Sequence, residues 1–128
     1  MDAPKLLPDI DSSALNLGDW AFRLGVAAVF VMFGLDKFPS DPHSEWVRIF
    51  RQIGLGDWFR YFTGVVEVAG GLLVLVPRTA LAGMIVLAVT MAGAVLAHVF
   101  RLHDGAYALL PGAIALLLAM TAHNRWSR

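Results

Sequence analysis

Four apolar stretches dominate the sequence and restrict it to a membrane-spanning helical fold. They cover about residues 20–38, 59–76, 80–100 and 107–122, and each is close to the length of about 17–25 residues that an α-helix needs to cross a bilayer. Of the 128 residues, 58% are hydrophobic and 16% are charged, whereas soluble domains average about 25% charged residues. We therefore expect an all-α integral membrane protein with little soluble mass.

Short connections between the later stretches predict how the helices are arranged. Residues 76–79 join the second stretch to the third, and residues 101–105 join the third to the fourth. Short links make consecutive helices antiparallel neighbours, so we expect a four-helix up-down bundle at 20–122, between a polar N-terminal arm at 1–19 and a polar tail at 123–128. Aromatic residues near the ends of the stretches are typical of membrane–water interfaces: Trp20, Phe38, Trp58, Tyr61, Phe100, Tyr107 and Trp126.

The first connection is longer and has the pattern of a short amphipathic helix. Between residues 44 and 53, apolar side chains recur at spacings of three and four, which places them on one helix face. Basic and amide side chains take the other face, as in helices that lie in a membrane interface. We expect an interfacial helix there, which could also fold over the end of the bundle as a lid. The apolar face consists of Trp46, Ile49, Phe50 and Ile53, and the polar face of Arg48, Arg51 and Gln52.

Charge and cysteine content exclude several kinds of function. The formal net charge is zero, so the chain has no basic field that would attract nucleic acid. It has no cysteine, and therefore no disulfide, no thiolate metal site and no dithiol relay of its own. The sequence also contains no motif for a flavin, a nicotinamide or an iron–sulfur cluster. A redox reaction would need its centre on a bound small molecule or on a partner.

One acidic residue, Glu67, lies inside the second apolar stretch. A carboxylate in the bilayer costs about 2.5–3.5 kcal/mol on insertion scales and is usually paired, protonated or functional. Glu67 is about eight residues into its stretch, which is roughly 12 Å along a helix. In an antiparallel bundle the ends of the first and third stretches reach the same membrane face. Lys37 and His98 are therefore expected in the same half of the bilayer as Glu67.

Three interpretations of Glu67 stay open. In the first it forms a structural pair with Lys37 or His98 that fixes helix register, since buried ion pairs can specify geometry while adding little stability. In the second it takes up and releases protons near the working pH. In the third, Glu67, Lys37 and His98 line a pocket for a quinone-like or other amphiphilic head group, and Lys37 or His98 donates a hydrogen bond to a carbonyl oxygen.

Two further features bear on binding sites. Arg23 lies near the opposite membrane face, where its side chain either extends to lipid headgroups or binds an anionic lipid or a partner. A direct pair between Arg23 and Glu67 is not expected, because the two lie at different depths. His98 and His103 are five residues apart, which is not the i, i+4 spacing of two helical metal ligands, so we expect no metal site.

Several pieces of the sequence, in their order and spacing, resemble the DoxX family of small bacterial membrane proteins over about residues 20–122. These pieces are Arg23-Leu24-Gly25, Phe33-Gly34-Leu35-Asp36-Lys37-Phe38, Thr63-Gly64-Val65-Val66-Glu67-Val68-Ala69-Gly70-Gly71-Leu72-Leu73, Pro77-Arg78-Thr79-Ala80, and Met91-Ala92-Gly93-Ala94 followed by His98. The resemblance implies a four-helix protein of the bacterial inner membrane, tied to respiratory or sulfur redox chemistry. One relative is a subunit of a thiosulfate:quinone oxidoreductase, and others are proposed partners in oxidative-stress complexes. The polar positions that carry over are Arg23, Lys37, Glu67 and His98.

The residues and the resemblance together give one leading hypothesis and one alternative. The leading hypothesis is a membrane subunit that supports quinone-linked electron transfer, in which Glu67, Lys37 and His98 act at the quinone head group and Arg23 contributes to binding. Its partner would be a larger membrane complex or a soluble redox protein. The alternative is a non-enzymatic accessory or assembly subunit, in which Glu67 is structural. Basic residues are nearly balanced between the two membrane sides, and the resemblance favours both termini in the cytoplasm.

Overall fold

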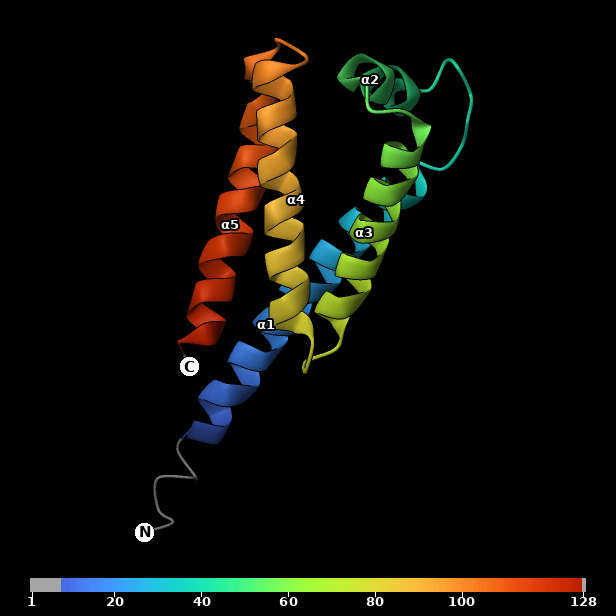
Figure 1. Ribbon diagram of the computed structural model, residues 1–128. Coiled ribbons are helices and arrows are strands. Elements are labelled where there is room, and N and C mark those ends of the chain that lie inside the picture. Colours follow the sequence, from blue (N-terminus) through green and yellow to red (C-terminus); the bar gives the residue numbers. More distant parts are fainter. Residues whose placement is uncertain (1–7, 128) are drawn as a thin grey trace.

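Between residues 8 and 127 the chain forms five α-helices and one short 3-10 helix (Figure 1). The computed structural model describes the backbone of residues 8–127 and the side chains of residues 17–127. The elements are α1 (Pro8–Leu35), α2 (Glu45–Ile53), α3 (Asp57–Leu75), α4 (Ala80–Phe100), the 3-10 helix η2 (Gly105–Ala108) and α5 (Leu109–Trp126). The predicted all-α fold class is confirmed.

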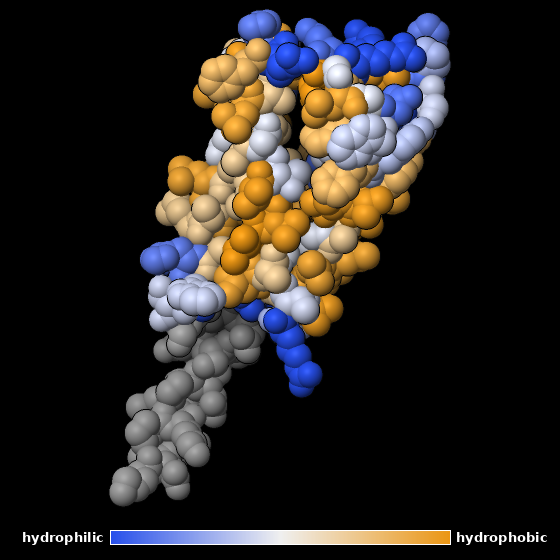
Figure 2. All heavy atoms as spheres, viewed as in Figure 1, coloured by the Kyte–Doolittle hydropathy of each residue, from blue (hydrophilic) through white to orange (hydrophobic). Residues whose placement is uncertain are grey.

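Four helical segments are long and apolar enough to cross a membrane: Leu17–Leu35 within α1, all of α3 and of α4, and Gly105–Trp126. Figure 2 shows hydrophobic residues over the middle of the molecule and hydrophilic ones at both ends, most of them at the end that carries α2. The protein is therefore a multi-pass membrane protein. The polar stretch expected as an N-terminal arm, residues 1–19, is helical from residue 8 onward, and residues 1–7 lie outside the described part of the chain.

The membrane helices pack in chain order: α1 on α3, α3 on α4, and α4 on α5 (Figure 1). The contact between α1 and α3 depends on two glycines. A Cβ at Gly34 would lie 2.7 Å from the carbonyl oxygen of Gly64, and a Cβ at Gly64 would lie 2.8 Å from that of Gly34. Any larger residue at either position would force the two backbones apart. Glycine there lets longer side chains a turn away reach across the interface.

The core that the four membrane helices share lies towards one end of the bundle. The buried side chains of α4 lie between Ala80 and Met91, and those of α5 are Leu118 and Ala122. Met91, Leu118 and Ala122 join Phe30 of α1 in one apolar cluster. The pair α4–α5 therefore packs on the pair α1–α3 mainly in this half, and Figure 1 shows α3 and α4 diverging towards the other end.

The short helix α2 covers the end where α3 and α4 have diverged (Figure 1). The helix predicted at residues 44–53 is present as α2, and it buries Val47, Phe50 and Ile53. Phe50 and Ile53 pack with Leu102, which follows α4. Arg101 also donates a 2.8 Å hydrogen bond to the carbonyl oxygen of Ile53. Through these contacts α2 connects the two helix pairs at this end of the bundle.

Candidate functional site

Lys37 and Glu67 form a buried ion pair at the end of the bundle that α2 covers. The Nζ atom of Lys37 is 2.9 Å from Oε2 of Glu67, and both side chains are 3% exposed. Lys37 lies in the turn that ends α1, where its backbone N–H donates to the carbonyl oxygen of Gly34. Glu67 projects from α3, about one turn beyond Gly64. The close approach of Gly34 and Gly64 thus brings the two charged side chains within reach of each other.

Trp46 of α2 covers the ammonium group of Lys37. Nζ lies 3.6 Å from the centroid of the Trp46 ring, a cation–π contact that contributes about 2 kcal/mol when it is desolvated. Nζ also donates a 3.3 Å hydrogen bond to the carbonyl oxygen of Phe33, whose ring packs against Trp46 with 6.2 Å between the centroids. The positive charge is therefore balanced by one carboxylate and covered by one indole.

The ion pair keeps unused hydrogen-bonding capacity. An ammonium group has three N–H donors. Lys37 directs two of them to Glu67 and Phe33, which leaves the third for the side occupied by the Trp46 ring. Oε2 of Glu67 accepts the bond from Lys37, while Oε1 receives no hydrogen bond from any residue that the structure describes. The site can therefore offer one donor and one acceptor to a small polar group.

His98 lies at the end of α4 but is bonded to a different partner. Its Nδ1 atom is 2.8 Å from Oδ1 of Asp104, in the connection between α4 and η2, and its side chain is 20% exposed. Its ring stacks on Tyr107 with 6.4 Å between the centroids. Of the residues predicted to act at the site, the structure joins Lys37 and Glu67 directly and places His98 in a separate pair.

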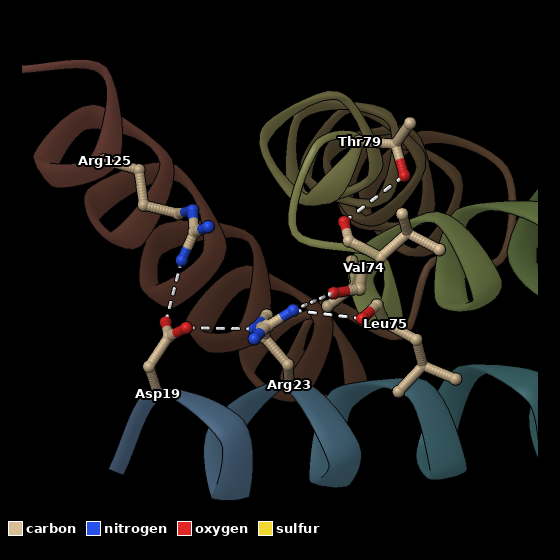
Figure 3. Close-up of polar contacts among 7 residues, drawn as sticks. Asp19, Arg23, Val74, Leu75, Thr79 and Arg125 are labelled. Carbon is tan, nitrogen blue, oxygen red and sulfur yellow. Dashed lines mark hydrogen bonds and ion pairs between the residues drawn. The ribbon is translucent and has the colours of Figure 1, made fainter. Parts of the chain in front are cut away.

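Arg23 lies at the far end of the α1–α3 pair, where it caps α3 (Figure 3). Its guanidinium group donates to the carbonyl oxygens of Val74 and Leu75 at 3.4 and 3.0 Å, and to Asp19 at 3.0 Å. These carbonyls carry the negative end of the α3 dipole. Asp19 also accepts a 2.8 Å bond from Arg125 of α5. Arg23 is 2% exposed, so the expectation that its side chain extends to lipid headgroups is wrong.

A second buried arginine, Arg60, caps the end of α1 and is absent from the residues predicted above. It is 1% exposed and donates to the carbonyl oxygens of Lys37 and, at 2.9 Å, of Pro39. Arg60 thus holds the backbone from which Lys37 reaches Glu67. The signal that identifies it is a repeated sequence that leads into each arginine: Gly18-Asp19-Trp20-Ala21-Phe22-Arg23 and Gly56-Asp57-Trp58-Phe59-Arg60.

Metal coordination finds no support in the geometry. Among the residues that the structure describes, no three His, Asp or Glu side chains come together in a way that could hold a metal ion. The pair of His98 with Asp104 supplies only two potential ligands, and structural zinc sites use four. The chemistry of the site is therefore that of a buried Lys–Glu pair under an aromatic cover.

Comparison with known proteins identifies the family. The model of the DoxX-like family matches residues 21–122, a range that includes Lys37, Glu67 and most of every membrane-spanning segment. No curated protein and no solved structure matches the chain. The resemblance inferred from the sequence is confirmed, and the protein belongs to the DoxX-like family.

Proposed function

We propose that the chain is a membrane subunit that supports quinone-linked electron transfer in a respiratory, sulfur or oxidative-stress redox system of the bacterial inner membrane. In this proposal Lys37 and Glu67 bind the quinone head group. The observation that carries the proposal is the capacity left on a buried, charge-balanced pair: one N–H donor on Lys37 and one acceptor oxygen on Glu67. Ionisable groups inside a membrane domain commonly mark functional sites.

The two free groups of the pair fit both oxidation states of a quinone. A carbonyl oxygen of the oxidised head group accepts a hydrogen bond, which Nζ of Lys37 can donate. A hydroxyl group of the reduced head group donates one, which Oε1 of Glu67 can accept. The charge on Lys37 strengthens its hydrogen bond to a carbonyl oxygen. One pair of side chains can therefore hold the ligand before and after reduction.

Glu67 also supplies a group that exchanges protons beside the head group. Reduction of a bound quinone consumes two electrons and two protons. The chain has no cysteine and no motif for a redox cofactor, so the electrons come from a partner protein. Lys37 orients the Glu67 carboxylate through their 2.9 Å contact, and Arg60 fixes the backbone of Lys37. The chain binds and orients, and the partner delivers the electrons.

Access to the pair depends on α2. Trp46 occupies the side of Lys37 that a head group would approach, so binding exchanges a cation–π contact for a hydrogen bond to a carbonyl oxygen. An isoprenoid tail would lie in the bilayer beside the end at which α3 and α4 diverge (Figure 1). We therefore expect the head group to enter from the membrane, beneath α2.

The test is the quinone content of protein purified gently from native membranes, measured by mass spectrometry of the extracted small molecules. Lys37→Met removes the ammonium donor, and Glu67→Gln removes the negative charge and replaces one acceptor oxygen with an NH2 group, each at nearly constant size. Loss of a charge-assisted hydrogen bond, worth about 1.5–3 kcal/mol, should weaken binding about tenfold or more. Arg48→Gln changes an exposed residue of α2 and is the matched control, which should keep the wild-type quinone content.

The same measurement can also contradict the proposal. If wild-type protein carries only bulk lipid and also fails to bind added ubiquinone-1, the proposal is wrong. If the wild type then co-purifies with a stable partner, and Glu67→Gln abolishes that complex, the chain is an accessory subunit in which Glu67 is structural.

A further inference from the structure

The buried residues of α1 and of the turn that follows it recur in α3 at a constant spacing. Where side chains are described, each buried position between residues 23 and 37 has a buried counterpart 37 residues later. The five matched pairs are Arg23 and Arg60, Ala27 and Gly64, Phe30 and Glu67, Gly34 and Gly71, and Lys37 and Val74. The further buried residue of α3, Gly70, faces Leu87 of α4. The two helices therefore pack through the same face in the same register.

The glycine contacts between α1 and α3 recur with the roles of the two helices exchanged. A Cβ at Gly34 would lie against Gly64 of α3, and a Cβ at its counterpart Gly71 would lie against Ala27 of α1, the counterpart of Gly64. The nearest side chains correspond in the same way, namely Val68 for Gly34 and Val31 for Gly71. Such an exchange is what an approximate two-fold axis between antiparallel helices produces.

The arginine caps are related by the same exchange of α1 and α3. Arg23 of α1 donates to the carbonyl oxygen of Val74 at the end of α3. Its counterpart Arg60 of α3 donates to the carbonyl oxygen of Lys37, the counterpart of Val74, after the end of α1. Each helix thus carries, near the start of its membrane-spanning segment, the cation that caps the end of the other.

The correspondence continues into the next helix of each unit. Val47 and Phe50 are buried in α2, and their counterparts at the same spacing, Met84 and Leu87, are buried in α4. The third buried residue of α2, Ile53, corresponds to Thr90, which is half-buried. Residues 23–53 and 60–90 are therefore two helix–turn–helix units that point in opposite directions. The counterpart of Trp46 is Gly83.

The two units differ in the contact that lies beside the caps. At one of the two equivalent positions, Lys37 and Trp46 of the first unit meet Glu67 of the second unit. At the other position the three counterparts are apolar, namely Val74 and Gly83 of the second unit and Phe30 of the first. Val74 and Phe30 belong to the shared apolar core, and a Cβ at Gly83 would lie 2.8 Å from a side-chain carbon of Val74.

We infer that the chain contains an inverted repeat, and that Lys37, Glu67 and Trp46 form a ligand site at one of its two equivalent positions. The fold fills the other position with apolar side chains, so packing does not require an ion pair there. Gly83 lets α4 lie directly on α3, whereas the indole of Trp46 stands between α2 and Lys37 as the cover of the site. The identity of the ligand, a carbonyl-bearing amphiphile, rests on the proposed function. The inverted repeat does not depend on it.

The test replaces the two charged side chains of the site with the side chains found at the equivalent apolar position. The double variant Lys37→Val, Glu67→Phe gives both equivalent positions the same pair of side chains. We expect it to fold, to melt in detergent close to the wild-type temperature, and to bind ubiquinone-1 at least about tenfold more weakly. A second double variant, Lys37→Met with Glu67→Met, keeps unbranched side chains of similar length and tests the same point if a ring at position 67 does not fit.

Two results would overturn the inference, and a third would overturn the proposed function. Unfolding of both double variants, while Arg48→Gln folds normally, overturns the inference, because the ion pair is then required for packing. Wild-type affinity for ubiquinone-1 in a folded double variant overturns it as well, because the ligand then binds elsewhere. If the wild type binds no ubiquinone-1, the proposed function fails, and the melting temperatures of the double variants alone decide whether the pair is structural.

Discussion

Lys37 and Glu67 put two opposite charges among apolar and aromatic side chains, where neither charge is tolerable alone. Removal of one partner from a buried ion pair costs about 3–5 kcal/mol, although the intact pair is often no more stable than an apolar pair of similar size. Single substitutions at this site therefore mix a loss of stability with a loss of binding. Exchange of the two residues separates these effects, because it keeps the ion pair and moves the donor to the other helix.

For the exchanged variant Lys37→Glu, Glu67→Lys, we expect partial recovery of stability relative to either single variant, and no recovery of quinone binding. The attraction between the charges is retained, but the free N–H donor no longer lies under Trp46. Thermal unfolding in detergent measures the first effect, and titration with ubiquinone-1 measures the second. Recovery of binding together with stability would show that the ligand needs only a buried pair, without the arrangement seen beneath α2.

At the scale of helices, α1 and α3 are held together by caps at both ends as well as by glycine contacts between them. The carbonyl oxygens at a helix end lack partners within their own helix, and a hydrogen bond from a charged donor contributes about 1.5–3 kcal/mol. Arg60 makes two such bonds to the turn that follows α1, at Lys37 and Pro39, and Arg23 makes two to the last residues of α3. The two caps should therefore be of similar importance for stability.

We predict that Arg60→Met lowers the free energy of unfolding by about 3 kcal/mol or more, because two carbonyl oxygens lose a charged donor. Arg60→Lys should recover only part of this loss, because both bonds start from Nη1 of Arg60 and the ammonium group of a lysine lies one bond closer to the backbone. Steric-trap or denaturant unfolding in micelles provides the measurement, with the exposed Arg48→Gln as control. Equal stability of Arg60→Met and wild type would show that the cap is dispensable.

The sequence predicts the membrane helices and places Lys37 and Glu67 in the same half of the bilayer, but it predicts neither the partner of His98 nor the two arginine caps. Each of these outcomes has a physical cause. Hydropathy and helical periodicity locate the membrane helices and α2, and antiparallel topology predicts that Lys37, Glu67 and His98 lie in the same half of the bilayer. The partner of His98 depends instead on a local turn: His103 has a positive φ of 54°, and this turn returns Asp104 to His98. The caps made by Arg23 and Arg60 depend on which carbonyl groups the ends of neighbouring helices present, a property that periodicity does not encode.

In the whole molecule, the four membrane helices pack together in one half, the closed half, and are divided into two pairs in the other half. The shared core joins all four membrane helices at one end, where Asp19 also links Arg23 to Arg125. At the other end, the pairs α1–α3 and α4–α5 are connected through α2, by the cluster of Phe50, Ile53 and Leu102. The closed half resists separation of the helices, so an opening motion belongs to the half that contains Lys37 and Glu67.

We therefore predict that fixing α2 to the end of α4 blocks access to the site. The chain has no cysteine, so a disulfide between Ile53→Cys and Leu102→Cys would be its single cross-link. Ubiquinone-1 should enter and leave the reduced variant at nearly the wild-type rate and should exchange far more slowly with the oxidised one. Quenching of tryptophan fluorescence on mixing follows the exchange, and addition of a reductant restores it within the same sample. Equal exchange rates in the oxidised and reduced states would mean that α2 does not move when the head group enters, and that the route to Lys37 lies between α3 and α4 alone.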